Sequence, residues 1–180
     1  EFQLTTIAVL LALAARRNIV VPLGRDAAPR HAKHLEIAQV ERRLLVDDGR
    51  VRAVPVQATS AHPYYDELRQ RESSGLVLFT SGSTGDSKAA VHDFERLLER
   101  YETPRPAWRT VLFLQLDHIG GLNTLLFTLA HGGAVIVPDE RTPRSVCEAI
   151  ARHKAELLPT SPTFLNLLLH SEEHRRHELS

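Results

Sequence analysis

The feature that most constrains the fold is a short apolar run, Leu-Val-Leu-Phe at residues 76–79, that leads directly into a segment rich in glycine, serine and threonine. A continuous apolar run of this length is typical of a strand buried on both faces. Between residues 89 and 101, apolar residues recur with helical spacing and charged residues lie between them, so we expect an amphipathic helix there. The sequence therefore predicts a strand, a loop and a helix in succession.

The segment between this strand and this helix has the composition of an anion site. Glycines adopt backbone conformations closed to other residues and let the backbone approach an oxyanion. Hydroxyl groups donate hydrogen bonds, a lysine adds positive charge, and the N–H groups at a helix start attract anions. We interpret the segment as a loop that grips the β- and γ-phosphates of ATP or a leaving pyrophosphate. Its candidate binding residues are Thr80, Ser81, Gly82, Ser83, Thr84, Gly85 and Lys88.

Two better-known phosphate loops do not fit this spacing. A Walker A loop needs glycine before its lysine and serine or threonine after it. This chain has Ser87 and Ala89 at those positions. The dinucleotide pattern Gly-x-Gly-x-x-Gly also fails, because the glycines are not spaced in that way. An ordinary flexible turn remains the alternative to a phosphate loop.

The remaining chain alternates helical and strand-like segments, which indicates an α/β fold with a mostly parallel sheet flanked by helices. We expect helices over residues 4–15, 30–39, 64–71, 121–130, 143–153 and 163–169, and strands over 18–21, 43–46, 51–56, 111–116, 134–137 and 156–158. A chain of 180 residues is long enough for one domain with its own core.

Composition excludes some classes of function. Lys plus Arg number 22 and Asp plus Glu also number 22, so no basic excess points to nucleic acid. The apolar run at residues 2–15 is too short to span a membrane. The single cysteine, Cys147, allows no disulfide within the chain and fits a cytoplasmic location. We expect Cys147 to be buried and unreactive.

Residues 78–88, Leu-Phe-Thr-Ser-Gly-Ser-Thr-Gly-Asp-Ser-Lys, closely resemble the signature loop of the adenylate-forming superfamily. That superfamily includes acyl-CoA synthetases, the adenylation domains of nonribosomal peptide synthetases, and luciferases. Its pattern is Thr/Ser-Ser-Gly-Ser/Thr-Thr-Gly-x-Pro-Lys-Gly, from which Ser87 and Ala89 depart. Residues 117–122, 132–137 and 159–164 resemble further segments of the family in the same order.

The resemblance implies a fold, an activity and a set of site residues. The chain would form part of the large N-terminal domain and take ATP, Mg²⁺, coenzyme A and a small carboxylic acid. Lys88 and His118 would be catalytic residues. The substrate pocket would include His118, Gly120, Gly121 and Leu122. A hydrogen-bonded histidine at the end of a strand is the alternative for His118, and an ordinary core residue is the alternative for Leu122.

Several motifs of the family do not occur in this sequence, among them its aromatic-Gly-x-Thr-Glu segment and the small C-terminal lid domain. We therefore expect residues 1–180 to be a partial adenylation domain that is inactive alone. Two alternatives stay open. The chain could belong to an adenylation domain that loads a carrier protein, or it could be a non-catalytic remnant that binds a partner or forms a homodimer.

Overall fold

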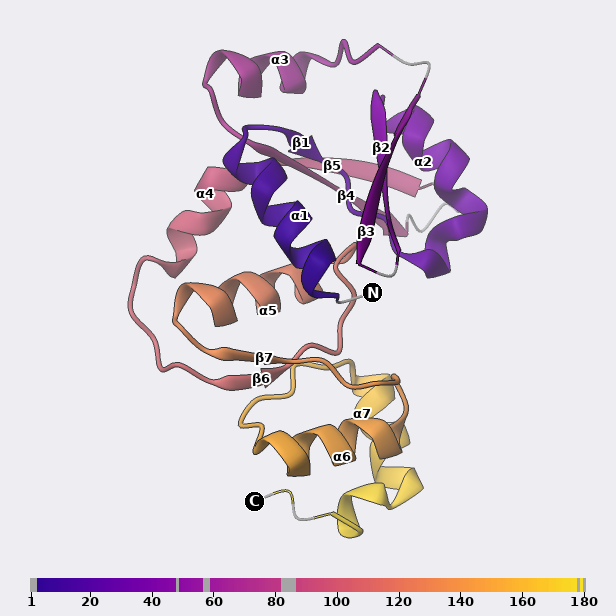
Figure 1. The fold of residues 1–180 in the computed structure, drawn as a ribbon, viewed down its shortest axis with the longest axis vertical. Coiled ribbons are helices and arrows are strands. Elements are labelled where there is room, and N and C mark those ends of the chain that lie inside the picture. Colours follow the sequence, from indigo (N-terminus) through magenta and orange to yellow (C-terminus); the bar gives the residue numbers. More distant parts are fainter. Residues whose placement is uncertain (1–2, 48, 57–58, 82–86, 178, 180) are drawn as a thin grey trace. The chain divides into compact units, whose positions relative to one another are not determined.

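The computed structural model describes residues 3–47, 49–56, 59–81, 87–177 and 179. The chain divides into two compact units, Glu1–Glu99 and Arg100–Ser180, and each has its own core (Figure 1). None of the helices in the described part of the chain has the length and apolarity that a bilayer crossing requires.

The first unit alternates helices and strands. Its elements are α1 (Leu4–Ala15), β1 (Ile19–Val20), η1 (Arg25–Arg30), α2 (His31–Ile37), β2 (Arg42–Asp47), β3 (Arg50–Pro55), α3 (Pro63–Gln70), β4 (Gly75–Ser81), β5 (Ser87–Asp93) and α4 (Phe94–Leu98). The strands form a three-stranded sheet of order β1-β4-β5 and a separate β2–β3 ribbon. β1 runs parallel to β4, whereas β5 runs antiparallel to β4.

The prediction of a helix over residues 89–101, directly after the Gly/Ser/Thr segment, is wrong in its first part. Residues 87–93 form β5, and the helix starts only at α4, followed by η2 (Glu99–Tyr101). Ala89 and Val91 pack against the buried cluster of Ala38, Tyr65 and Val77, so every second residue of this stretch faces one side of the sheet. Strand pairing with β4 therefore overrides the weak helical spacing of these residues.

Asp93 marks the change from strand to helix. Its carboxylate accepts hydrogen bonds from the backbone N–H groups of Glu95 and Arg96, at 3.1 and 3.3 Å, and so caps α4. It also accepts a hydrogen bond from the hydroxyl of Ser73, at 2.6 Å, and pairs with Arg71 at 2.9 Å. These contacts attach the end of β5 to the turn that precedes β4.

The second unit is built on two short parallel strands, β6 (Arg109–Val111) and β7 (Ala134–Ile136). Its helices are α5 (Ile119–Ala130), α6 (Pro143–His153), α7 (Pro162–Ser171) and η3 (Glu173–Arg175). Figure 1 shows α5 on one side of the strand pair and α6 on the other. The core on the α6 side contains Val111, Ile136 and Ala149.

The strands of this unit are shorter than the sequence predicts. The strand expected over 111–116 ends at Val111, although Leu112 and Phe113 beyond it are buried. The strand expected over 156–158 is reduced to a single bridge between Leu157 and Thr110. Apolar runs here reflect burial in loops packed against helices, and periodicity alone does not separate that case from a buried strand.

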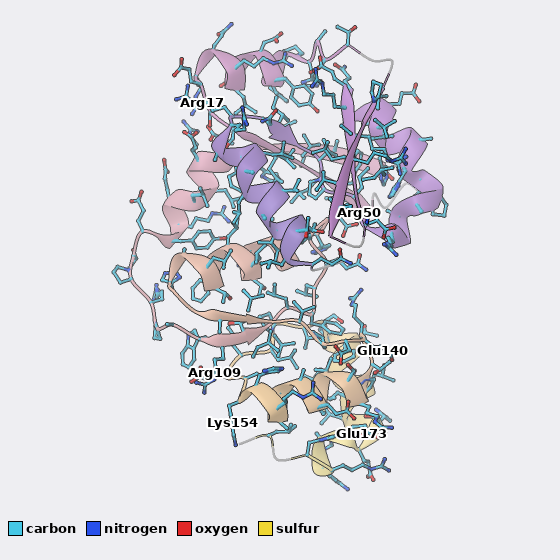
Figure 2. The ribbon with its side chains drawn as sticks, viewed as in Figure 1. Arg17, Arg50, Arg109, Glu140, Lys154 and Glu173 are labelled. Carbon is cyan, nitrogen blue, oxygen red and sulfur yellow. The ribbon has the colours of Figure 1, made fainter. Side chains whose placement is uncertain are left out.

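The helices of the second unit are closed at their ends by side chains. Thr142 and Ser161 accept hydrogen bonds from Ser145 N at 3.3 Å and Phe164 N at 3.2 Å, and so cap α6 and α7. At the other end of α6, Arg109 Nε donates a 2.6 Å hydrogen bond to the carbonyl of Lys154 (Figure 2). The ends of α6 agree with the prediction from sequence.

The α/β fold class is confirmed. The expectation of a mostly parallel sheet holds for β1–β4 and β6–β7, whereas β4–β5 and β2–β3 are antiparallel. An antiparallel hairpin needs only a short turn, whereas parallel strands need a crossover connection. The antiparallel strands β4 and β5 are separated in the sequence by residues 82–86 alone.

Candidate phosphate-binding site

The predicted phosphate loop joins the loop ends of β4 and β5. The strands pair up to Ser81 and Ser87, with Thr80 opposite Lys88 one step before. Gly82, Ser83, Thr84 and Gly85 lie outside the residues that the structure describes, as does the side chain of Ser81. The described site therefore consists of the strand ends that hold the loop.

Thr80 and Lys88 lie on the same face of the hairpin, because directly opposed residues of an antiparallel pair share a face. Both side chains are exposed. The Thr80 hydroxyl is 3.5 Å from the carbonyl oxygen of Lys88, which is at the limit of a hydrogen bond. A hydroxyl donor and an ammonium group thus lie side by side and exposed at the loop end of the hairpin.

The structure removes one part of the predicted phosphate grip. A strand, and not a helix, follows the loop, since β5 begins at Ser87. The partial positive charge of a helix start directly after the loop is therefore unavailable here. Lys88 and the donors of the segment itself must supply the attraction for an anion.

The face of the hairpin opposite Lys88 is packed. Val77 of β4 is fully buried and contacts the buried Ala38 and Tyr65. The Tyr65 hydroxyl donates a 3.0 Å hydrogen bond to the Ala38 carbonyl. Burial raises the pKa of Tyr65, and the nearby charge of Arg69 offsets part of that rise. The tyrosine thus stays neutral and holds α3 to the chain after α2.

Sequence reasoning missed one residue at this site. His34 of α2 is buried, with only 3% of its surface exposed. Its ring stacks on Phe79 with 3.9 Å between the centroids, and its Nε2 lies 3.1 Å from the hydroxyl of Ser87. No local spacing links residue 34 to residue 87, so the sequence carries no signal for this contact.

The other predicted site residues lie in the second unit, where His118 is the N-cap of α5. Its Nδ1 accepts a 3.2 Å hydrogen bond from the backbone N–H of Gly120, and the residue is exposed. From the sequence, a hydrogen-bonded histidine stayed open as the alternative to a pocket residue, and the structure shows that hydrogen bond. Its role in a substrate pocket stays a prediction.

Gly121 and Leu122 are built into the interior of the second unit. A side chain at Gly121 would have its Cβ 2.0 Å from the carbonyl oxygen of Gln115 and 2.3 Å from that of Leu114. Leu122 is fully buried. Gly120 has more room, because a Cβ there would meet side chains and no backbone, the end of Leu114 at 2.9 Å and Nδ1 of His118 at 3.4 Å. Close backbone packing alone thus accounts for glycine at position 121.

A hollow of about 30 Å³ lies between the chain after β7 and α6, with Asp139, Ser145, Glu148, Arg152 and His153 in its lining. It has room for about one or two water molecules and not for a nucleotide. Within the described ranges, no group of three or more His, Cys, Asp or Glu could hold a metal ion.

Cys147 is fully buried in the second unit, as expected. Burial raises the pKa of its thiol, and the nearby Glu173 raises it further. Because the reactive form is the thiolate, this cysteine is poorly suited to nucleophilic chemistry.

Two solved structures have the fold of this chain. The N-terminal domain of FACL13 from Mycobacterium tuberculosis aligns over 98% of the chain and 46% of its own length, with a TM-score of 0.53 and 20% identity. The amide bond synthetase McbA from Marinactinospora thermotolerans aligns over 86% of the chain and 32% of its own length, with a TM-score of 0.51 and 24% identity. The chain thus shares its fold with these two proteins.

The whole chain, residues 1–180, matches the family of AMP-binding enzymes and belongs to it. It is 27% identical to the 4-coumarate–CoA ligase-like 5 protein of Oryza sativa over 93% of the chain, which is 33% of that relative. It is 30% identical to the sulfoacetate–CoA ligase of Cupriavidus necator over 68% of the chain, which is 25% of that relative. The matched regions thus span a quarter to a third of these relatives.

Proposed function

We propose that this chain is the phosphate-binding part of an acid–thiol ligase. The observation that carries the proposal is the membership of residues 1–180 in the AMP-binding enzymes, together with the exposed pair Thr80 and Lys88 at the loop end of the hairpin. Of the two relatives named above, one is named a CoA ligase and the other CoA ligase-like. The proposed substrates are ATP with Mg²⁺, a carboxylic acid and coenzyme A.

The proposed reaction has two steps. A carboxylate oxygen attacks the α-phosphorus of ATP, the bond from that phosphorus to the bridging oxygen breaks, and pyrophosphate leaves. The thiolate of coenzyme A then attacks the acyl carbon, and AMP leaves with the bonding electrons. Lys88, as a fixed positive charge, would stabilise the negative charge that develops on the β- and γ-phosphates in the first step. Thr80 would donate a hydrogen bond to the same oxygens.

The first test is ATP–pyrophosphate exchange in a protein that carries this chain together with the parts its relatives have beyond the matched region. A panel of carboxylic acids would identify the substrate. Lys88→Ala should lower exchange by about a hundredfold or more, by analogy with the loss of one donor to a developing oxyanion. Lys33→Ala is the matched control, because it removes the same charge from α2 in the same unit. Equal exchange in the two variants would contradict the role of Lys88.

We propose that residues 1–180 bind phosphates but do not complete the ligation alone, because they span a quarter to a third of the two CoA-ligase relatives. Incubating the chain with ATP, Mg²⁺ and the best acid of the panel should yield no acyl-adenylate. Mass-spectrometric detection of an acyl-adenylate would contradict this part of the proposal. If transfer occurs, replacing coenzyme A by a phosphopantetheinylated carrier protein distinguishes the two possible thiol acceptors.

A self-associating, non-catalytic role is the second candidate. It is favoured by α7, which exposes Leu165 by 46%, Leu167 by 53% and Leu169 by 52%. Large apolar side chains gathered on one element favour association with a second copy of the chain. Light scattering after size-exclusion chromatography measures this directly. A dimer that dissociates when Leu165 and Leu169 are replaced by Glu would support this role, and a monomer would exclude it.

A further inference from the structure

Two contacts of His34 converge on the loop end of the β4–β5 hairpin. The imidazole stacks nearly parallel on Phe79 of β4, with 13° between the ring planes, and its Nε2 is 3.1 Å from the hydroxyl of Ser87 on β5. One buried side chain of α2 therefore holds both strands at the point where they enter the predicted phosphate loop.

The contact with His34 ties the side chain of Ser87 to the α2 side of the hairpin. Successive side chains of a strand point to opposite faces, so Ser87 toward α2 places Lys88 on the other face, beside Thr80. A slip of one residue in the pairing would exchange the faces of all side chains on β5. Lys88 would then point into the packed side around Val77, and the exposed position beside Thr80 would lose its positive charge.

We propose that His34 is a positioning residue for phosphate binding: through Ser87 it holds the register of β5 and keeps Lys88 on the ligand face. The inference rests on the proposed function, since it assigns His34 to the same site. Stacking on Phe79 alone could be achieved by an apolar ring. A histidine ring with only 3% of its surface exposed needs hydrogen-bond partners, so the choice of histidine here points to the bond with Ser87.

The test uses the 180-residue chain and inorganic pyrophosphate as the probe, with calorimetry for affinity and the NMR shift of the Lys88 amide for its placement. His34→Phe keeps the ring stack and removes the bond to Ser87. Ser87→Ala removes the same bond from the other side. His34→Gln places an amide, which can donate and accept hydrogen bonds, at about the position of the imidazole Nε2 and so can keep a bond to Ser87. His31→Phe is the matched control, since His31 lies on the same helix and its Nε2 contacts the Gly24 carbonyl at 2.9 Å.

We expect His34→Phe and Ser87→Ala each to weaken pyrophosphate binding about three- to tenfold, the range for one net hydrogen bond. The double variant should bind no more weakly than either single one, because both remove the same interaction. His34→Gln should recover binding to within about twofold of the unmodified chain. His31→Phe should bind pyrophosphate as the unmodified chain does.

Two results would overturn the inference. Folded His34→Phe or Ser87→Ala chains with unchanged affinity would remove the positioning role and leave the phosphate site standing. If His34→Phe fails to fold by circular dichroism, Ser87→Ala alone decides, because its small, partly exposed side chain is safe to shorten. Absence of pyrophosphate binding by the unmodified chain would overturn the proposed function and this inference together.

Discussion

The two groups of predicted site residues differ in how the fold uses them. At the loop end of the β4–β5 hairpin, Thr80 and Lys88 are exposed, while Val77 on the opposite face packs into a buried cluster. At the start of α5, Gly121 and Leu122 are enclosed by their own unit, and the exposed His118 is committed to a backbone cap. The first group is available to a ligand, whereas most of the second maintains the fold.

Because of this contrast, resemblance to a family motif does not by itself distinguish residues that bind a ligand from residues that maintain the fold. Both segments resemble the family in sequence, yet a substitution in one should change binding and in the other stability. The difference follows from burial, since an enclosed atom cannot change without moving its neighbours. Substitutions at three positions, Gly121, Asp93 and His118, have expected effects on stability that decrease in that order.

The largest effect is expected for Gly121→Ala. The new methyl group would lie 2.0 Å from one backbone carbonyl oxygen and 2.3 Å from a second, and backbone atoms cannot turn aside as a side chain can. We expect a loss of about 3 kcal/mol or more in the free energy of unfolding, measured by urea denaturation followed by circular dichroism.

The neighbouring Gly120→Ala is its control. Its Cβ would meet two side chains, the flexible end of Leu114 at 2.9 Å and Nδ1 of His118 at 3.4 Å, and alanine favours a helix by about 1 kcal/mol over glycine. We expect Gly120→Ala to stay within about 1 kcal/mol of the unmodified chain. Similar losses for both variants would show that the start of α5 is less tightly enclosed than the structure indicates.

An intermediate effect is expected for Asp93→Asn, at the end of the hairpin away from the loop. Burial raises the pKa of this carboxyl, but hydrogen bonds from Ser73 and Arg96 and the charge of Arg71 outweigh it, so the pKa lies below its ordinary value. Asparagine caps helices as well as aspartate does, so the substitution removes mainly the charge. We expect a loss of about 1 kcal/mol at pH 7.

The sign of this effect with pH is fixed by the lowered pKa. The contribution of Asp93 is complete above the pKa of the unfolded chain, about 3.9, and disappears as the pH falls through the folded value below it. The difference between Asp93→Asn and the unmodified chain should therefore shrink below about pH 4. Asp66→Asn, at a carboxyl with 54% exposure, serves as the control and should change stability little. A difference that grows in acid would contradict the assignment.

The smallest effect on stability is expected for His118, where two substitutions separate the cap from the proposed pocket role. His118→Ala removes the bond to Gly120 N and should cost about 0.5 kcal/mol, whereas His118→Asn replaces it with a preferred cap and should cost nothing. In the exchange assay, His118→Asn should still raise the KM for the carboxylic acid. An unchanged KM would leave His118 with a capping role alone.

Much of the fold follows from local sequence signals. α1 covers residues 4–15 and α6 covers 143–153, as predicted. For α6 the reason is local, because Thr142 caps the first turn and Pro143 suits its first position. The stretch after the phosphate loop could not be assigned in the same way. Its apolar spacing is compatible with a helix, and pairing with β4 made it a strand up to Asp93.

The sequence by itself determined the family of this chain, the α/β class, the capped helices and the position of the Gly/Ser/Thr segment, since each depends on residues close together along the chain. Only the tertiary structure decided that a strand follows that segment, that Lys88 and Thr80 share a face, and that His34 contacts Ser87. It also decided that Gly121 has no room for a side chain. These features depend on strand register and on contacts between separate elements, which no local spacing encodes.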